Sequence, residues 1–179
     1  MQIPNFGTEI DDQATRAQQA APTWMPLELI AYKGLTDNQS DVTPRLIGWR
    51  KEQDASGLVP GGFLVSLAWE EVPGTHLGDQ LGSDAFWNLD EDERNRVRDA
   101  FKVTLHKIER MGYKPLFAST RNLVWDPTSN TLFVVGFREW GYVDPTPWME
   151  LKFALFGLVK MPSISNLSEW DGDTSGWVF

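Results

Sequence analysis

The chain has 179 residues, the usual length of one compact domain, and 41% of them are hydrophobic, which is enough for a sizeable core. Its 25 Asp and Glu outnumber its 16 Lys and Arg, and the net charge of -9 disfavours binding to nucleic acid or to an anionic membrane surface. With no cysteine and only two histidines, the sequence excludes disulfides, thiol catalysis, cysteine-ligated metal sites and histidine-rich metal sites.

The first residues are expected to differ from the rest of the chain. Residues 1–22 are polar and rich in Gln, Ala and Asp, with at most a marginal helix over residues 11–21. We therefore predict a flexible arm over residues 1–22 and a single domain over residues 23–179. At the start of that domain, residues 26–35 predict a short helix, because Pro26 suits the first helical position, where its missing N–H is no loss.

Two strands are expected next, over residues 42–51 and 63–69, with a glycine-containing turn between them. The second strand has apolar residues on both faces, which favours a central strand over an edge strand. Pro73-Gly74 ends it.

The best-defined element is a long helix over residues 90–111. Asp90 is a suitable N-cap, Glu93 stands three residues later as in a capping box, and Gly112 is a suitable C-terminal cap. The apolar residues of its buried face recur at helical spacing: Val97, Phe101, Leu105, Ile108 and Met111.

The remaining elements are shorter. Residues 122–125 and 132–137 predict two strands joined by a turn, and residues 146–161 predict a last apolar helix. The polar tail after Pro162 carries Trp170 and Trp177, which indicates that it packs back onto the domain.

Four short strings in the sequence keep the order and spacing of a known family. Residues 67–74 read LAWEEVPG, Leu105-His106 is followed by Gly112, residues 121–124 read RNLV, and residues 132–137 read LFVVGF. In that order they resemble the hinge, the helix before the catalytic loop, the end of that loop, and the strand leading into Asp-Phe-Gly of protein kinases and aminoglycoside-phosphotransferase-like proteins. The resemblance covers roughly residues 27–140.

This resemblance implies an α+β fold of a shortened protein-kinase-like type, similar to small fungal kinase-like proteins. It implies partial strands of the N-terminal lobe, a hinge, the long helix, a catalytic-loop hairpin and a reduced C-terminal lobe.

The chain departs from the family at the positions that carry its chemistry. Phosphotransfer needs a carboxylate to orient the attacking hydroxyl and metal ligands to neutralise phosphate charge. The catalytic aspartate position is Phe117, the histidine position before it is Pro115, and the metal-binding aspartate position is Gly136. Of the metal ligands only Asn122 remains, and one neutral oxygen cannot hold magnesium on a nucleotide. We therefore expect no Mg-ATP phosphotransfer, no metal and no cofactor.

Four residues are predicted to line what remains of the ligand cleft. They are Glu28, Trp69, Asn122 and Arg138. Too few residues precede Glu28 to supply the glycine-rich loop and the lysine that normally pairs with this glutamate. Asn122 is interpreted as holding its loop in shape. Arg138 is expected either to form an internal salt bridge with Glu28 or Glu70, or to anchor an anionic ligand.

If the chain is an enzyme, its candidate catalytic residues are Glu70, His76, His106 and Arg138. For each of them a structural role competes. Glu70 with Glu71 fits a hinge turn, because adjacent strand residues point apart. His76 fits a surface histidine, and His106 fits a structural histidine on the apolar side of the long helix.

Two functions follow from these patterns. The first is a catalytically inactive kinase-like module (a pseudokinase) that binds a protein partner or a second copy of itself, since the many aromatic residues favour interfaces. The second is an enzyme of other chemistry, of the isomerase or cyclase type in specialised metabolism, that uses the former nucleotide cleft as an apolar pocket. The N-terminus lacks a signal peptide pattern, and no apolar stretch reaches the ~20 residues of a membrane span, so we expect a cytoplasmic protein without membrane contacts.

Overall fold

A computed structural model describes residues 1–20, 25–54, 57–79, 81, 84–162 and 170–179. These residues form a mixed α+β structure whose strands make three small antiparallel sheets, β1-β2, β3-β5-β6 and β4-β7. The helices are α1 (Gln13–Gln18), α2 (Leu27–Asp37), η1 (Ala85–Asn88), α3 (Glu91–Arg110), η2 (Thr120–Asn122) and α4 (Leu151–Leu155). The strands are β1 (Leu46–Asp54), β2 (Gly62–Trp69), β3 (Thr75–His76), β4 (Tyr113–Pro115), β5 (Leu123–Asp126), β6 (Thr131–Val134) and β7 (Trp140–Tyr142).

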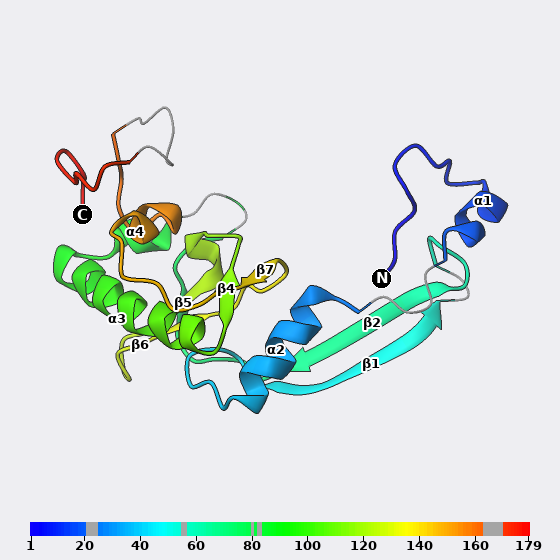
Figure 1. Ribbon diagram of the computed structural model, residues 1–179, viewed down its shortest axis with the longest axis horizontal. Helices are drawn as coiled ribbons and strands as arrows, with labels where there is room; N and C mark the ends of the chain where they lie inside the picture. Colours follow the sequence, from blue (N-terminus) through cyan, green and yellow to red (C-terminus); the bar gives the residue numbers. More distant parts are fainter. Residues whose placement is uncertain (21–24, 55–56, 80, 82–83, 163–169) are drawn as a thin grey trace.

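The molecule consists of a packed body and a projecting hairpin (Figure 1). The body is built around α3 with β4 to β7 and α4. The β1–β2 hairpin extends away from it, α2 lies across the near end of the hairpin, and the N-terminal segment with α1 lies at its far end (Figure 1). The elements that connect the two parts are therefore α2, the base of the hairpin and the segment that follows β2.

The long helix α3 forms the centre of the core, as its sequence predicts. Asp90 is the N-cap and accepts a hydrogen bond from the Glu93 amide at 2.8 Å, and Gly112 follows the helix with φ of +87°. The predicted apolar face is buried except for its last residue, Met111, which is partly buried. Phe101 packs against Phe153 and Phe156 with ring centroids 5.8 and 4.8 Å apart. The 3.6-residue repeat therefore identified the core helix and its inward side.

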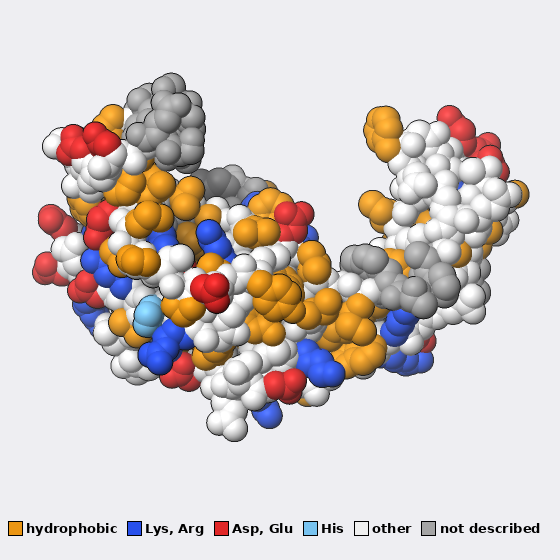
Figure 2. Space-filling view, viewed as in Figure 1, with side chains coloured by type: hydrophobic (Ala, Val, Ile, Leu, Met, Phe, Trp, Pro, Cys, Tyr) orange, Lys and Arg blue, Asp and Glu red, His pale blue; other side chains and the backbone are white. Residues whose placement is uncertain are grey.

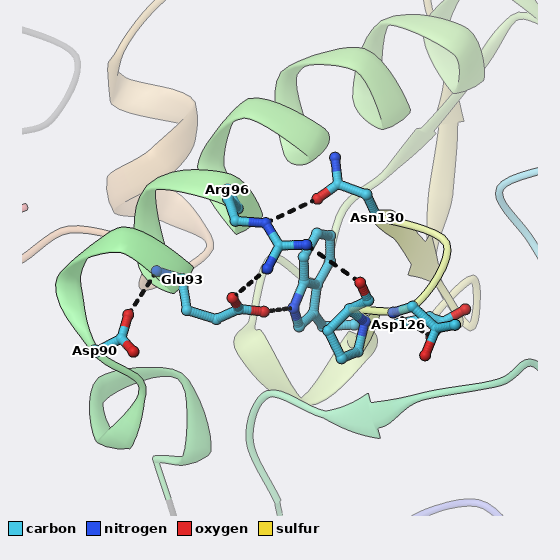
Figure 3. Close-up of polar contacts among 8 residues, drawn as sticks. Asp90, Glu93, Arg96, Asp126 and Asn130 are labelled. Carbon is cyan, nitrogen blue, oxygen red and sulfur yellow. Dashed lines mark hydrogen bonds and ion pairs between the residues drawn. The ribbon is translucent and has the colours of Figure 1, made fainter.

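A polar cluster joins the first turn of α3 to the β5–β6 turn (Figure 3). The Trp125 indole donates to one carboxylate oxygen of Glu93 at 2.5 Å, and Arg96 pairs with the other at 2.6 Å. Arg96 also donates to the Asn130 side chain and to the Pro127 carbonyl, both at 3.2 Å. These contacts fix β5 and β6 against the helix, and so they fix the loop that leads into β5.

The last part of the body differs from the predicted helix over residues 146–161. Only Leu151–Leu155 is helical, because Pro147 precedes it and Gly157 ends it with φ of +76°. The Lys152 ammonium forms a buried ion pair with Glu109 of α3 at 2.7 Å. The tail does pack back, since Trp177 is buried and the backbones of Lys160 and Val178 pair.

The hairpin and the N-terminal segment also depart from expectation. Among the described residues β2 pairs only with β1, so the prediction of a central strand was wrong. Its apolar residues on both faces lie in a two-stranded ribbon instead. At the far end, the Gln2 amide donates to the Phe63 carbonyl at 2.9 Å, and Arg16 donates to the Leu58 carbonyl at 2.6 Å. The flexibility of residues 1–22 stays a prediction, and residues 21 and 22 lie outside the described residues.

Candidate functional site

A cleft of about 890 Å³ lies where α2, the end of β2, β3, η2 and the residues after β6 meet. Its volume is within the range of small-molecule sites in proteins, ~300–1,000 Å³. The residues that line it are Glu28, Trp69, His76, Gly78, Asp79, Phe117, Arg121, Asn122, Val135, Gly136 and Arg138.

The cleft brings together all four residues predicted to bind a ligand, Glu28, Trp69, Asn122 and Arg138, together with the catalytic candidate His76. They come from five separate segments of the chain: α2, the end of β2, β3, η2 and the residues after β6. The roles assigned to them stay predictions, because position in a cleft is not itself a function.

Two of the catalytic candidates lie elsewhere. Glu70 is exposed and forms an ion pair with Arg45, and this hydrogen bond lowers the pKa of its carboxyl group. His106 is exposed on α3, beside a shallow depression of about 290 Å³ that Trp148 and Lys152 also line. The prediction that His106 faces the apolar side was wrong, because one helical residue turns ~100° and only its neighbour Leu105 points inward.

Asn122 is held in place by contacts to both of its flanking segments. Its side-chain amide donates to the Phe117 carbonyl at 2.8 Å, and its own carbonyl accepts from the Val135 amide at 2.9 Å. The side chain lies directly over Gly136, where an added Cβ would be only 2.2 Å from the Asn122 amide carbon. Any side chain at position 136 therefore displaces Asn122.

Phe117 occupies the cleft beside Asn122 and is half-exposed. Position 117 thus offers a hydrophobic ring rather than an acid to anything bound in the cleft. The neighbouring Leu116 amide donates to the Glu139 carbonyl at 3.0 Å, which ties this loop to the segment before β7.

Tyr32 forms the buried wall behind the cleft. Its ring stacks on Trp69 with centroids 5.2 Å apart and packs edge-on against Phe137 at 5.5 Å. Its hydroxyl donates to the Val135 carbonyl at 2.5 Å. Burial raises the pKa of Tyr32 well above its usual range, so the hydroxyl stays protonated and keeps donating. Tyr32 thereby joins α2, β2 and the residues after β6.

Glu28 and Arg138 face the same cleft but do not form the predicted ion pair. Their charged atoms are more than 4.0 Å apart, since no such pair occurs among the described residues. Burial raises the pKa of Glu28, and the positive charge of Arg138 only partly offsets this effect. The Arg138 side chain is exposed. Its salt bridge with Glu70 is also excluded, since Glu70 pairs with Arg45.

The segment after β2 is fixed against β5 by close contacts. Gly74 has φ of +114°, and a Cβ there would be 2.2 Å from the Trp125 carbonyl oxygen. The His76 ring nitrogen Nδ1 lies 3.3 Å from the Arg121 carbonyl. His76 is exposed, as expected for a surface histidine, at the rim of the cleft.

The sequence did not predict Tyr32 behind the cleft, nor the lining residues Gly78, Asp79, Arg121 and Val135. Tyr32 stands four residues after Glu28, so the two share one helix face, and that spacing was a usable signal. Asp79 lies in an irregular segment and Arg121 in the three-residue helix η2, and neither is long or regular enough for periodicity to show which way a side chain points.

The described residues contain no group of three or more His, Asp or Glu arranged to hold a metal ion. None of the helices in that same part of the chain is long and apolar enough to cross a membrane.

In comparisons with known proteins, no family model matches the chain, and none of the curated proteins searched matches it.

Proposed function

We propose that this chain is a catalytically inactive kinase-like module that acts by binding a protein, either a partner or a second copy of itself. The order of α2, the β1–β2 hairpin, α3, the loop ending at Asn122 and the β5–β6 hairpin supports the kinase-like interpretation. The β4–β7 pairing, which brings the loop beside the residues after β6, is consistent with it.

The observation that carries the proposal is the contact of Asn122 with Gly136. A carboxylate at 136 would be needed to hold magnesium, but the Asn122 side chain fills that space and is tied to the Phe117 carbonyl. With Phe117 in place of the acid that orients the acceptor hydroxyl, both charged anchors of phosphotransfer are missing together.

Incubation with γ-labelled ATP and magnesium tests this absence. We expect no label on the chain or on a generic protein or small-molecule acceptor, and no thermal stabilisation by Mg-ATP. The Gly136→Asp variant is expected to lose stability without gaining Mg-ATP binding, because the new side chain displaces Asn122. Label transfer that disappears in Asn122→Ala would overturn the proposal.

Exposed apolar side chains near β4 and β7 support the protein-binding role. Tyr142 is 80% exposed and Leu116 is 54% exposed. Leu27 lies beside them, because its carbonyl accepts from the Trp140 indole at 2.7 Å and the Trp140 ring is 4.7 Å from that of Tyr142. Hydrophobic side chains gather over α2, β7 and the base of the hairpin (Figure 2). Exposed apolar patches of this kind mark interaction sites.

Sedimentation of the wild type and of Tyr142→Asp separates the two kinds of binding. If the chain self-associates, the wild type should sediment with a mass above that of one chain. The mass should fall to that of one chain in Tyr142→Asp and stay at the wild-type value in Val103→Asp. Val103 is the matched control, because it is an exposed apolar residue on the water-facing side of α3.

If the wild type sediments as one chain, a photo-crosslinking residue at position 142, compared with one at position 103, tests for a separate partner in cells. A protein captured at 142 alone, and lost when Leu116 is changed to Asp, supports the partner form. The absence of both self-association and capture contradicts the protein-binding role.

The cleft favours a second candidate, an enzyme of non-phosphotransfer chemistry acting on a small molecule. Of its four catalytic candidates only His76 and Arg138 line the cleft. The expected outcome is loss of turnover in His76→Gln or Arg138→Gln and no change in His106→Gln. Turnover that survives both cleft substitutions dismisses this candidate.

A further inference from the structure

The cleft contains an aromatic stack that is open on one side. Tyr32 is fully buried, and its ring covers one face of Trp69 with an interplanar angle of 21°. Trp69 is nevertheless 41% exposed and lines the cleft, so part of its ring surface can contact a ligand. A planar ring placed there would extend the Tyr32–Trp69 stack by one more layer, and half-exposed Phe117 lines the same cleft.

The cleft also presents positive charge in a chain of net charge -9. Arg138 and Arg121 both line it, and neither forms an ion pair within 4.0 Å with a carboxylate among the described residues. Arg138 lines the same cleft as Trp69, and its side chain is exposed. An uncommitted guanidinium can hold a planar carboxylate through two parallel hydrogen bonds.

The remaining charges limit how negative a ligand can be. Glu28 and Asp79 share the cleft with the two arginines. A nucleotide triphosphate would meet both acids without a metal ion to neutralise its phosphates. A single carboxylate adds only one negative charge, which one arginine balances.

We propose that this cleft binds a planar aromatic monocarboxylate without a metal ion, with the ring stacked on Trp69 and the carboxylate held by Arg138. This site is additional to the protein-binding role and independent of it. It gives the small-molecule candidate a ligand class, and it requires binding only, not turnover.

Titration calorimetry with 2-naphthoate as the probe tests the site. We expect the wild type to bind 2-naphthoate. The neutral analogue 2-naphthamide should have a dissociation constant about tenfold higher or more, since a tenfold change in affinity corresponds to the loss of one moderate interaction. Arg138→Gln is expected to weaken 2-naphthoate to the level of the amide, whereas Arg110→Gln, on the exposed end of α3, leaves it unchanged.

The stacking of the ligand ring on Trp69 is tested by a second variant with its own control. Trp69→Leu is expected to weaken 2-naphthoate about tenfold or more, and Trp49→Leu to leave it unchanged. Trp49 is the control because it lies on the same hairpin, is 47% exposed and does not line the cleft. Should Trp69→Leu unfold the hairpin, Trp69→Phe keeps a ring against Tyr32 and is expected to weaken binding by a smaller factor.

Three results overturn the proposal. They are no binding of 2-naphthoate to the wild type, equal binding of the acid and the amide, and binding that survives both Arg138→Gln and the Trp69 substitutions. A fourth result, tighter binding of ATP without magnesium than of 2-naphthoate in the same calorimetric experiment, overturns the assignment of the ligand class.

Discussion

The body around α3 and the β1–β2 hairpin are stabilised in different ways. The body buries large side chains from α3, β5, β6 and α4 against one another, and it adds the Glu93–Trp125–Arg96 cluster and the Lys152–Glu109 pair. Within the described part of the chain, the hairpin is held chiefly by its own strand pairing, by α2 at its near end and by the N-terminal segment at its far end. An isolated two-stranded ribbon is marginally stable in water. The difference indicates that the body holds its shape by core packing, whereas the hairpin depends on a few contacts at its ends.

The largest effect is expected in the core. Phe101→Ala should lower the free energy of unfolding by about 3–5 kcal/mol, because it leaves a cavity among Phe153 and Phe156. Leu64→Ala, at a half-buried position near the far end of the hairpin, should cost less than about 1.5 kcal/mol. Urea denaturation followed by circular dichroism measures both. Equal losses would mean that the hairpin is as tightly packed as the body.

A buried charge gives the next largest effect. Lys152→Met should lower the free energy of unfolding by about 3 kcal/mol, because it leaves Glu109 buried without its partner. The double variant Lys152→Met with Glu109→Leu should recover most of that loss, since two apolar side chains need no ion pair. Thermal denaturation of the three proteins provides the comparison. A double variant that is less stable than Lys152→Met would show that the pair has a further structural role.

Tyr32 connects the body and the hairpin, and removing its hydroxyl should lower the free energy of unfolding by less than the two core substitutions. Tyr32→Phe removes the hydrogen bond to the Val135 carbonyl and should cost about 1–2 kcal/mol. The pKa of Tyr32 is raised in the folded state, so its contribution is complete below the ordinary value of 10.0 and is lost as the pH rises above it.

The stability difference between wild type and Tyr32→Phe should accordingly shrink above pH ~10, by up to about 1.4 kcal/mol per pH unit. Tyr113 also has a raised pKa, but it is present in both proteins. Its effect on stability therefore cancels when the wild type is compared with Tyr32→Phe. Denaturation series across this pH range measure the effect. A difference that stays constant with pH would contradict the buried position of the Tyr32 hydroxyl.

The smallest effect is expected at the far end of the hairpin. Arg16→Ala removes the hydrogen bond to the Leu58 carbonyl and should change global stability by less than about 1 kcal/mol. Amide hydrogen exchange should nevertheless become faster in β1 and β2 and stay unchanged in α3, because local opening depends on local contacts. Unchanged exchange in the hairpin would show that the N-terminal segment does not stabilise it.

Sequence periodicity identified the elements whose structure is determined by local sequence. The α3 helix, its Asp90 cap and the β5–β6 hairpin were predicted correctly because caps, turns and the 3.6-residue repeat act locally. The last helix was overestimated, since a run of apolar residues did not reveal where Pro147 and Gly157 limit it. His106 was wrongly assigned to the apolar side of α3, because it is one residue away from the buried Leu105 and so points in another direction.

The candidate site was predicted in part. Glu28, Trp69, Asn122 and Arg138 were predicted to line one cleft and they do line one, because the order of elements sets which segments meet, while their binding roles stay predictions. The resemblance did not reveal that Asn122 lies over Gly136, since such a contact depends on side-chain packing across two segments. It also missed Tyr32, whose stacking on Trp69 joins residues far apart in the chain.

The close approach of Gly74 to the Trp125 carbonyl has a consequence for the cleft. Gly74 stands five residues after Trp69, the last residue of β2, so it ties the chain to β5 directly behind that side chain. Trp69 is thus held from two sides, by the Tyr32 ring and by this short connection. A side chain at position 74 would push the connection off β5, and it is therefore expected to disturb the aromatic wall of the cleft as well as the pairing of β3 with β5.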